Sequence, residues 1–130
     1  MNDLLQLGKK YKNLVVLSAG ADAHLACEEF AKYFPDRYFS FGLGFSNAVS
    51  VAAGFSLTGK MPLVVGNRLF SRAYEQMLDD ICVPNLNVKF VTAAKAGQAG
   101  EVLGDLPNLE EVSSLEEGFE AYGPKYMKTV

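Results

Sequence analysis

The sequence has few of the residues on which metal, disulfide and nucleophilic chemistry depend. It contains one histidine and two cysteines, and Cys27 and Cys82 lie far apart without a CxxC spacing. No cluster of His, Cys and acidic residues has metal-ligand spacing, and the remote His24 cannot complete a Ser/His/Asp or Cys/His catalytic set. We expect His24 on a helix surface, and both cysteines as small core residues of a reduced, cytoplasmic protein.

Long apolar runs and long basic runs are also absent. No stretch approaches the roughly 20 apolar residues that a membrane span needs, and no basic run exceeds Lys9-Lys10. The formal net charge of −3 argues against a nucleic-acid partner. The first residues lack the basic start and apolar run of a signal peptide. We therefore expect a cytoplasmic protein that binds neither membranes nor nucleic acids.

Short apolar runs alternate with amphipathic stretches along the chain. The length of 130 residues and a hydrophobic share of 49% predict a single globular domain, residues 1–130. Strands are expected at 14–18, 37–41, 63–65, 88–91, around Val112 and at 125–128. Helices are expected at 4–11, 22–34, 46–58 and 69–81, and a last one from the capping-box pattern at 113–116. This rhythm predicts an α/β fold with a doubly wound, mostly parallel sheet and helices on both faces.

Several stretches of the chain match, in order, the sequence motifs of a known protein family. They are Leu14–Ala19 with Asp22 nearby, Phe34–Phe39 (FPDRYF), Gly42–Lys60, Arg72–Gln76 (RAYEQ), Asn85–Lys89 (NLNVK), Pro107-Asn108 and Gly123–Tyr126. In this order they resemble the pyrimidine-binding domain of the transketolase family, a part of thiamine-diphosphate-dependent enzymes. The resemblance covers nearly the whole chain and implies the doubly wound fold of that domain.

The departures from the family pattern fall mainly on its chemistry. The family's catalytic glutamate, which holds the aminopyrimidine and promotes proton transfer, corresponds to Phe45, which has no ionisable group. The aromatic positions that stack on the pyrimidine correspond to Gly66 and Leu69, whereas the family's arginine is retained as Arg72. The resemblance therefore implies no catalytic residue here. It offers Gly44, Phe45, Asn47, Leu69 and Arg72 as candidates for cofactor contact.

Other parts of a complete transketolase site have no counterpart in the sequence. Residues 94–105 lack the family's glycine–aspartate–glycine stretch and its histidine, and no diphosphate-binding domain is present. The chain is expected to bind no cofactor alone, and to contact thiamine diphosphate with Mg²⁺ only in a complex. The first hypothesis is a non-catalytic domain, a pseudoenzyme, that works through protein contact as a homodimer or with a diphosphate-domain partner. The alternative is a subunit of a split thiamine-diphosphate-dependent transferase.

Three patterns have competing interpretations. The expected helix at 46–58, with Ser46 as N-cap and Gly59 as the residue after its end, is rich in small side chains. These favour packing on the domain's own sheet, a close subunit contact as in the family, or both. Gly42-Leu43-Gly44 is better interpreted as a tight turn than as a phosphate loop. Glu75, Asp79 and Asp80 fit a solvated, ion-paired helix face better than paired catalytic carboxylates.

Overall fold

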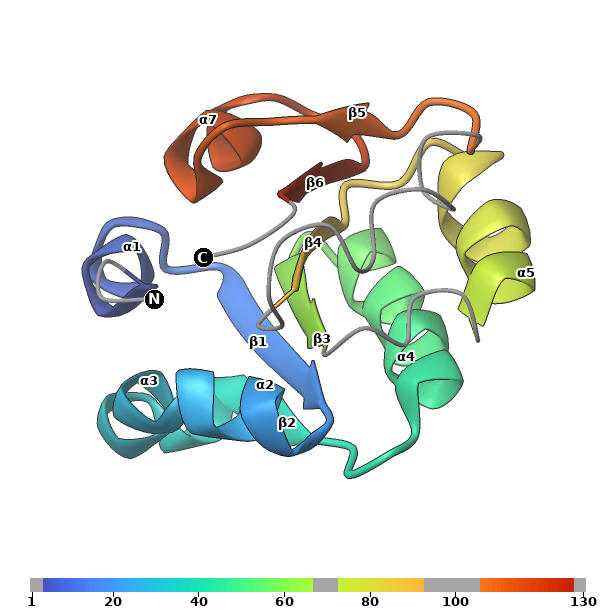
Figure 1. Cartoon of the computed structure of the whole chain (residues 1–130). Helices are drawn as coiled ribbons and strands as arrows, with labels where there is room; N and C mark the ends of the chain where they lie inside the picture. The colour runs from blue at the N-terminus through green and yellow to red at the C-terminus, as the bar shows by residue number, and fades with distance from the viewer. Residues whose placement is uncertain (1–3, 67–72, 93–105, 128–130) are drawn as a thin grey trace.

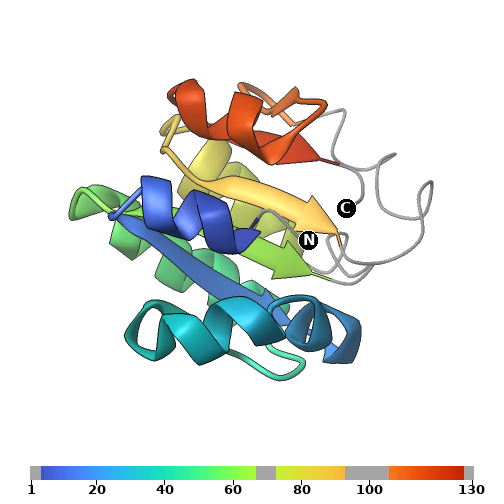
Figure 2. The ribbon, with the colours of Figure 1, turned by 90° about the vertical axis from the view of Figure 1, so that its left-hand side faces the viewer.

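One six-stranded parallel sheet organises the chain. The computed structural model describes residues 4–66, 73–92 and 106–127. The strands are β1 (Leu14–Ala19), β2 (Tyr38–Ser40), β3 (Met61–Gly66), β4 (Lys89–Thr92), β5 (Glu110–Glu111) and β6 (Lys125–Met127). They lie in the order β2-β1-β3-β4-β6-β5, and every neighbouring pair is parallel. Figure 2 shows the strand arrows pointing the same way. The predicted α/β fold with a doubly wound parallel sheet is confirmed.

Helices cover both faces of this sheet. One face carries α1 (Leu4–Lys10), α2 (Ala21–Ala26), α3 (Glu28–Tyr33) and α7 (Leu115–Glu120), and the other carries α4 (Phe45–Leu57) and α5 (Tyr74–Gln76) with the π-helix η3 (Met77–Cys82) (Figure 1). All six residues of β1 and all six of β3 are buried. Alternate residues of each strand belong to two separate hydrophobic clusters, one per face. This is why the strands are continuously apolar rather than alternating.

The helix α4 differs from the prediction at its start and matches it at its end. The N-cap is Gly44, without a side-chain cap, so the expectation of Ser46 as N-cap is wrong. The Gly44 amide is held by the carbonyl of Phe41 at 2.8 Å, so a backbone turn replaces the side-chain cap. At the other end, Gly59 has φ +87° and the Lys60 amide donates to the Phe55 carbonyl. The predicted glycine stop is confirmed as a Schellman motif.

Two other predicted helices are divided or altered. The helix expected at 22–34 is interrupted at Cys27, where ψ is 3°, and continues as α3. The second half of this segment packs closely on α1, since a Cβ added at Gly8 would lie 2.7 Å from the Phe30 ring. The helix expected at 69–81 is described only from residue 73, and from Met77 onward its geometry is that of a π-helix. The strand expected around Val112 is β5, which ends at Glu111, although the Val112 amide still donates a hydrogen bond to the Tyr126 carbonyl.

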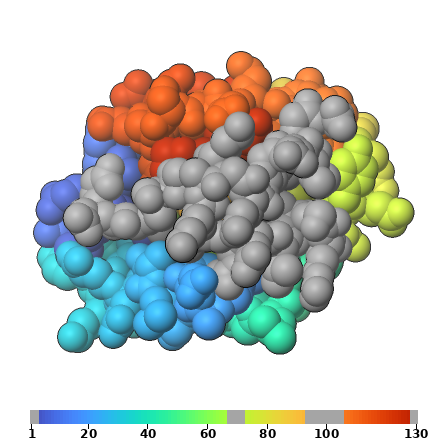
Figure 3. All heavy atoms as spheres, in the orientation of Figure 1, coloured from blue at the N-terminus to red at the C-terminus, as the bar shows by residue number. Residues whose placement is uncertain are grey.

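Polar side chains join the N-terminal helix to the rest of the fold. The guanidinium of Arg37 donates to the carbonyls of Gly8, Tyr11 and Leu14 at 2.8 to 2.9 Å and lies over the Phe34 ring. An exposed ion pair of 2.8 Å links Lys10 to Glu116 on α7. The space-filling view shows the N-terminal and C-terminal segments side by side there (Figure 3). The exposed pair contributes little to stability, so Arg37 is the stronger link.

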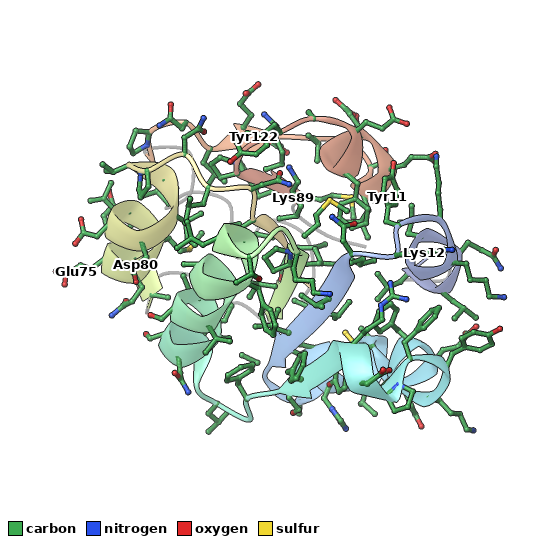
Figure 4. The ribbon with its side chains drawn as sticks, turned by 180° about the vertical axis from the view of Figure 1, so that it is seen from behind. Tyr11, Lys12, Glu75, Asp80, Lys89 and Tyr122 are labelled. Carbon is green, nitrogen blue, oxygen red and sulfur yellow. The ribbon has the colours of Figure 1, made fainter. Side chains whose placement is uncertain are left out.

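The strands β4 and β6 begin with two neighbouring lysines that are both buried. Lys89 is 2% exposed and its ammonium donates to the carbonyls of Ala121 and Gly123, each at 2.6 Å (Figure 4). Lys125, its partner in register, forms a 2.7 Å ion pair with Glu110. Burial, reinforced by the charge of Lys125, lowers the pKa of Lys89 to about 7. Folding therefore favours release of this proton.

This shift predicts that stability rises with pH just above neutrality. The unfolded chain keeps the Lys89 proton up to its ordinary pKa near 10.5, so between about pH 7 and that value unfolding takes up a proton. Urea unfolding between about pH 7 and 8.5 should show the free energy of unfolding increasing, by at most about 1.4 kcal/mol per pH unit. The buried thiols oppose this rise as the pH nears their ordinary pKa of 9.0, because burial raises both pKa values in the folded chain, so the increase should be steepest at the lower end of this window.

The matched variants are Lys89→Met and Lys12→Met. Lys12 is exposed, so its replacement should leave the slope unchanged, while Lys89→Met should flatten it. A flat profile for the wild-type protein would show that the two carbonyls keep Lys89 protonated.

Candidate functional site

The carboxyl ends of β1 and β3 form the topological switch point of the sheet. In the sheet β1 lies between β2 and β3, so the two strands that follow it in the chain are on opposite sides of it. In open α/β sheets, ligands bind in the crevice outside the carboxyl ends of strands at such a point. The turn above β1 and β2 is tied by backbone bonds from Phe41 to Ser18 at 2.8 Å and from Gly20 to Gly42 at 2.6 Å. The start of α4 is thereby fixed at this edge.

The side chain of Phe45 occupies the core beneath the carboxyl ends of these strands. It is the first residue of α4, is 2% exposed, and belongs to the core cluster between α4 and the sheet. Its ring lies against Gly66, the last residue of β3. A Cβ added at Gly66 would be 3.0 Å from Cδ2 of Phe45 and closer still to Cε2. Only a glycine leaves room for the ring in its present position.

The other site candidates are divided between the described and undescribed parts of the chain. Gly44 caps α4 and is half-buried, and Asn47 is exposed in the first turn of that helix. The structure thus brings together Gly44, Phe45 and Asn47 at one helix start, beside Gly66. Leu69 and Arg72 lie outside the described residues. Gly42 has φ +59° in the turn that precedes α4, in accordance with the tight-turn interpretation.

A hydrogen-bonded chain of Ser18, Tyr38 and His24 lies on the opposite face of the same edge. The Tyr38 hydroxyl is 2.6 Å from the Ser18 hydroxyl and 2.6 Å from Nδ1 of His24. Ser18 is fully buried and His24 is exposed on α2, as predicted for the histidine. Burial raises the pKa of Tyr38. No sequence spacing signals this cluster, because parallel pairing of β1 and β2 creates it. Its inner hydroxyl is closed to substrates.

The remaining polar candidates lie in surroundings that fit structural roles. Cys27 and Cys82 are free and buried, as predicted, and burial raises both pKa values. Glu75 and Asp79 are exposed, and Asp80 accepts a 3.2 Å hydrogen bond from Ser50 on α4. Within the described ranges no group of three or more His, Cys, Asp or Glu side chains can hold a metal ion. Among the same residues no helix is long and apolar enough to span a bilayer.

Comparisons with known proteins agree with this arrangement. No family model matches the chain. It is 39% identical over 104 residues to the "putative transketolase C-terminal section" of Methanocaldococcus jannaschii, which covers 78% of this chain and 32% of that protein. It is 36% identical over 99 residues to the 1-deoxy-D-xylulose-5-phosphate synthase of Desulfotalea psychrophila, which covers 75% of this chain and 15% of that enzyme. The chain thus spans a third or less of these relatives.

A solved structure extends the agreement to the whole fold. The protein described as "split gene transketolase, inactive beta4 tetramer" superposes with a TM-score of 0.85 at 30% identity. The match covers 98% of this chain and 48% of that chain. The parallel sheet, with its switch point between β1 and β3 and helices on both faces, defines the class of open α/β domains. Within that class, the chain belongs to the transketolase family, as a domain of the pyrimidine-binding type.

The close packing of Phe45 and Gly66 predicts a strong energetic coupling between them. Phe45→Ala should destabilise by about 3–5 kcal/mol through the cavity it leaves. Gly66→Ala should cost about 1–3 kcal/mol through overpacking, and much less when Phe45 is already replaced by alanine. Urea unfolding of the two single variants and the double variant should give a coupling of about 1–3 kcal/mol.

Gly118→Ala is the matched control for this cycle. A Cβ there meets Val112 at an ordinary 3.4 Å, so its effect should be the same in the wild-type chain and in the Phe45→Ala variant. Additive effects of Phe45→Ala and Gly66→Ala would contradict the packing described.

Proposed function

We propose that this chain is a transketolase-type pyrimidine domain that performs no thiamine-diphosphate chemistry by itself and works through protein contact. The observation that carries the proposal is the position and burial of Phe45. By the family resemblance it stands where the catalytic glutamate belongs, and its ring is packed in the core against Gly66. Proton transfer to and from the cofactor needs a carboxyl group within hydrogen-bond reach. A benzyl side chain supplies no such group.

The residues at this edge also fit the cofactor's pyrimidine ring poorly. The family's stacking aromatic corresponds to Gly66, which has no side chain to stack. The aromatic ring that is present, Phe45, approaches Gly66 from the helix side and occupies the space that a side chain at position 66 would take. In the family these two positions hold a carboxyl group and a stacking aromatic ring. Here they hold one buried aromatic ring and a glycine. This exchange supports a domain that keeps the scaffold and lacks the chemistry.

The first test is cofactor binding by the isolated chain. Titration of the purified protein with thiamine diphosphate and Mg²⁺ in a calorimeter should give no binding heat, and no carboligase or ketol-transfer activity should appear. Binding at micromolar cofactor concentration, or turnover by the chain alone, would overturn the proposal.

The comparisons favour a second candidate function. One similar protein is described as the product of a split transketolase gene, and another as a transketolase C-terminal section. By analogy, this chain would be one subunit of a split thiamine-diphosphate-dependent enzyme, and a partner subunit would carry the diphosphate-binding domain and its Mg²⁺. In that complex the residues Gly44, Phe45, Asn47, Leu69 and Arg72 would be the candidates for contact with the pyrimidine, as the family resemblance implies. The chain would position the cofactor, and the partner would supply the missing polar groups.

Reconstitution separates the two candidates. The chain is mixed with a diphosphate-domain subunit from the same genome, thiamine diphosphate and Mg²⁺, and ketol transfer is assayed. Under the second candidate activity appears only in the mixture and increases in Phe45→Glu, because a carboxyl group returns to the pyrimidine. Phe45→Leu is the matched control, which opens similar space without the carboxyl group, and circular dichroism checks the fold of both. Inactivity of every mixture would support the non-catalytic candidate.

A further inference from the structure

The boundary between β4 and β6, the seam, joins the last two strands of the sheet to the other four. The C-terminal unit, residues 106–127, contains β5, α7 and β6 and lies at one end of the sheet (Figure 1). Three residue pairs join β6 to β4, whereas six pairs join β1 to β3. Proteins open locally in contiguous units that often coincide with supersecondary motifs. The seam is the natural boundary of such a unit.

Polar contacts across the seam centre on Lys89. Its side-chain nitrogen donates to the carbonyls of Ala121 and Gly123, which lie in the loop between α7 and β6. The side chain of Asn87 accepts a hydrogen bond of 3.1 Å from the Gly123 amide. Lys89 on β4 and the exposed Tyr122 in the loop mark the two sides of this contact (Figure 4). An amine buried in the seam therefore holds the backbone of the C-terminal unit.

A positive charge on this amine opposes the same contact. Lys89 and Lys125 are partners in register across the seam, and both side chains are buried. Lys125 has a counter-ion on its own side of the seam, since Glu110 lies 2.7 Å away. Among the described residues no carboxylate pairs with Lys89, whose acceptors in the unit are neutral carbonyls. Like charges opposite each other destabilise strand pairing, and burial of an unpaired charge adds to the cost.

The hydrogen bonds of Lys89 do not require its charge. An ammonium group has three N–H donors, and the neutral amine keeps two, which matches the two carbonyls. The neutral form therefore keeps the contact without burying a charge. In accordance with this, burial and the charge of Lys125 lower the pKa of Lys89 to about 7. When the seam opens, the side chain returns to water and to its ordinary pKa.

Other titratable side chains near the seam have contacts of their own or are exposed. β3 places the apolar Leu63 in register with Lys89, and His24 lies on α2, bonded to Tyr38 and away from the seam. The groups on β6, α7 and α1 are Tyr126, bonded to Glu111; Glu116, paired with Lys10; Glu117, bonded to Ser113; Tyr11, in edge contact with Phe119; and the exposed Glu120. Lys89 is thus the buried group whose charge depends on whether the seam is closed.

We propose that the seam is a pH-sensitive joint, at which uptake of a proton by Lys89 favours release of the C-terminal unit from β4. The proton charges an amine that is buried when the seam is closed and solvated when it is open, so acid increases the open population. With a pKa of about 7 in the closed form and 10.5 in the open form, the opening equilibrium should increase about tenfold from pH 8 to pH 6. Release is local, because the β1–β3 pairing persists, and it does not depend on the proposed function.

Amide hydrogen exchange at pH 6 and pH 8, measured by NMR and corrected for intrinsic exchange rates, tests the joint. The reporters are the amides of Lys125–Met127, of which the Lys125 amide bonds across the seam to the Val88 carbonyl. Their protection should be lower than that of the β1 and β3 amides at both pH values, because the unit opens without global unfolding. It should also be about tenfold greater at pH 8 than at pH 6.

Two variants identify the responsible charge. Lys125→Met removes the opposing charge, so the seam amides should gain protection at pH 6 and the ratio between the two pH values should fall. A gain in protection is not a consequence of misfolding. Lys89→Met should show equal protection at both pH values. His24→Gln is the matched control, because histidine ordinarily titrates in this range, and it should keep the tenfold ratio.

Four results would overturn the joint. They are seam amides as strongly protected as those of β1 and β3, equal protection of the wild-type seam at the two pH values, a ratio that persists in Lys89→Met, and a ratio that disappears in His24→Gln. All measurements use the chain without cofactor, so they are separate from the test of cofactor binding.

Discussion

The pairing of β1 with β3 is the constraint on which the rest of the molecule depends. Six residue pairs join these strands, from Leu14 with Met61 to Ala19 with Gly66, and all twelve residues are buried. A parallel pair in the centre of a sheet needs cover on both faces. The helices before and after each strand supply that cover, which fixes the two-cluster core and the place of the switch point. The positions of Gly44, Phe45 and Asn47, the candidate site residues that the structure describes, follow from this pair.

Phe45 is the residue at which the fold of the family is kept while, in the proposed function, its chemistry is absent. In a catalytic domain the end of β3 and the start of α4 must leave space for a ligand and a polar group. Here the same junction is closed by a ring against a glycine, and the residues become part of the core. A buried aromatic ring contributes to stability, whereas a buried carboxyl group costs stability unless it is paired. In the proposed function, the lack of a carboxyl group and the gain of packing therefore have the same physical cause, which is the ring of Phe45.

Much of the fold was predictable from the sequence, because it is encoded locally. Continuous apolar runs marked β1 and β3, and Gly59 marked the end of α4. Ser114 marked the start of α7, where its side chain accepts from Glu117. The errors came from a contact distant in sequence at Cys27 and from a local backbone turn at Gly44. Cys27 breaks a helix whose second half packs on α1, and Gly44 rather than Ser46 caps α4 because a backbone turn holds it. The contact of Phe45 with Gly66 and the Ser18–Tyr38–His24 chain need the sheet order, which no local pattern contains.

The two outer strands have a consequence for assembly. At one margin of the sheet β2 has only three residues, and at the other β5 consists of two exposed glutamates. Short or acidic margins resist the addition of a further strand from another molecule. Sheets of neighbouring molecules therefore cannot join edge to edge into a growing ribbon.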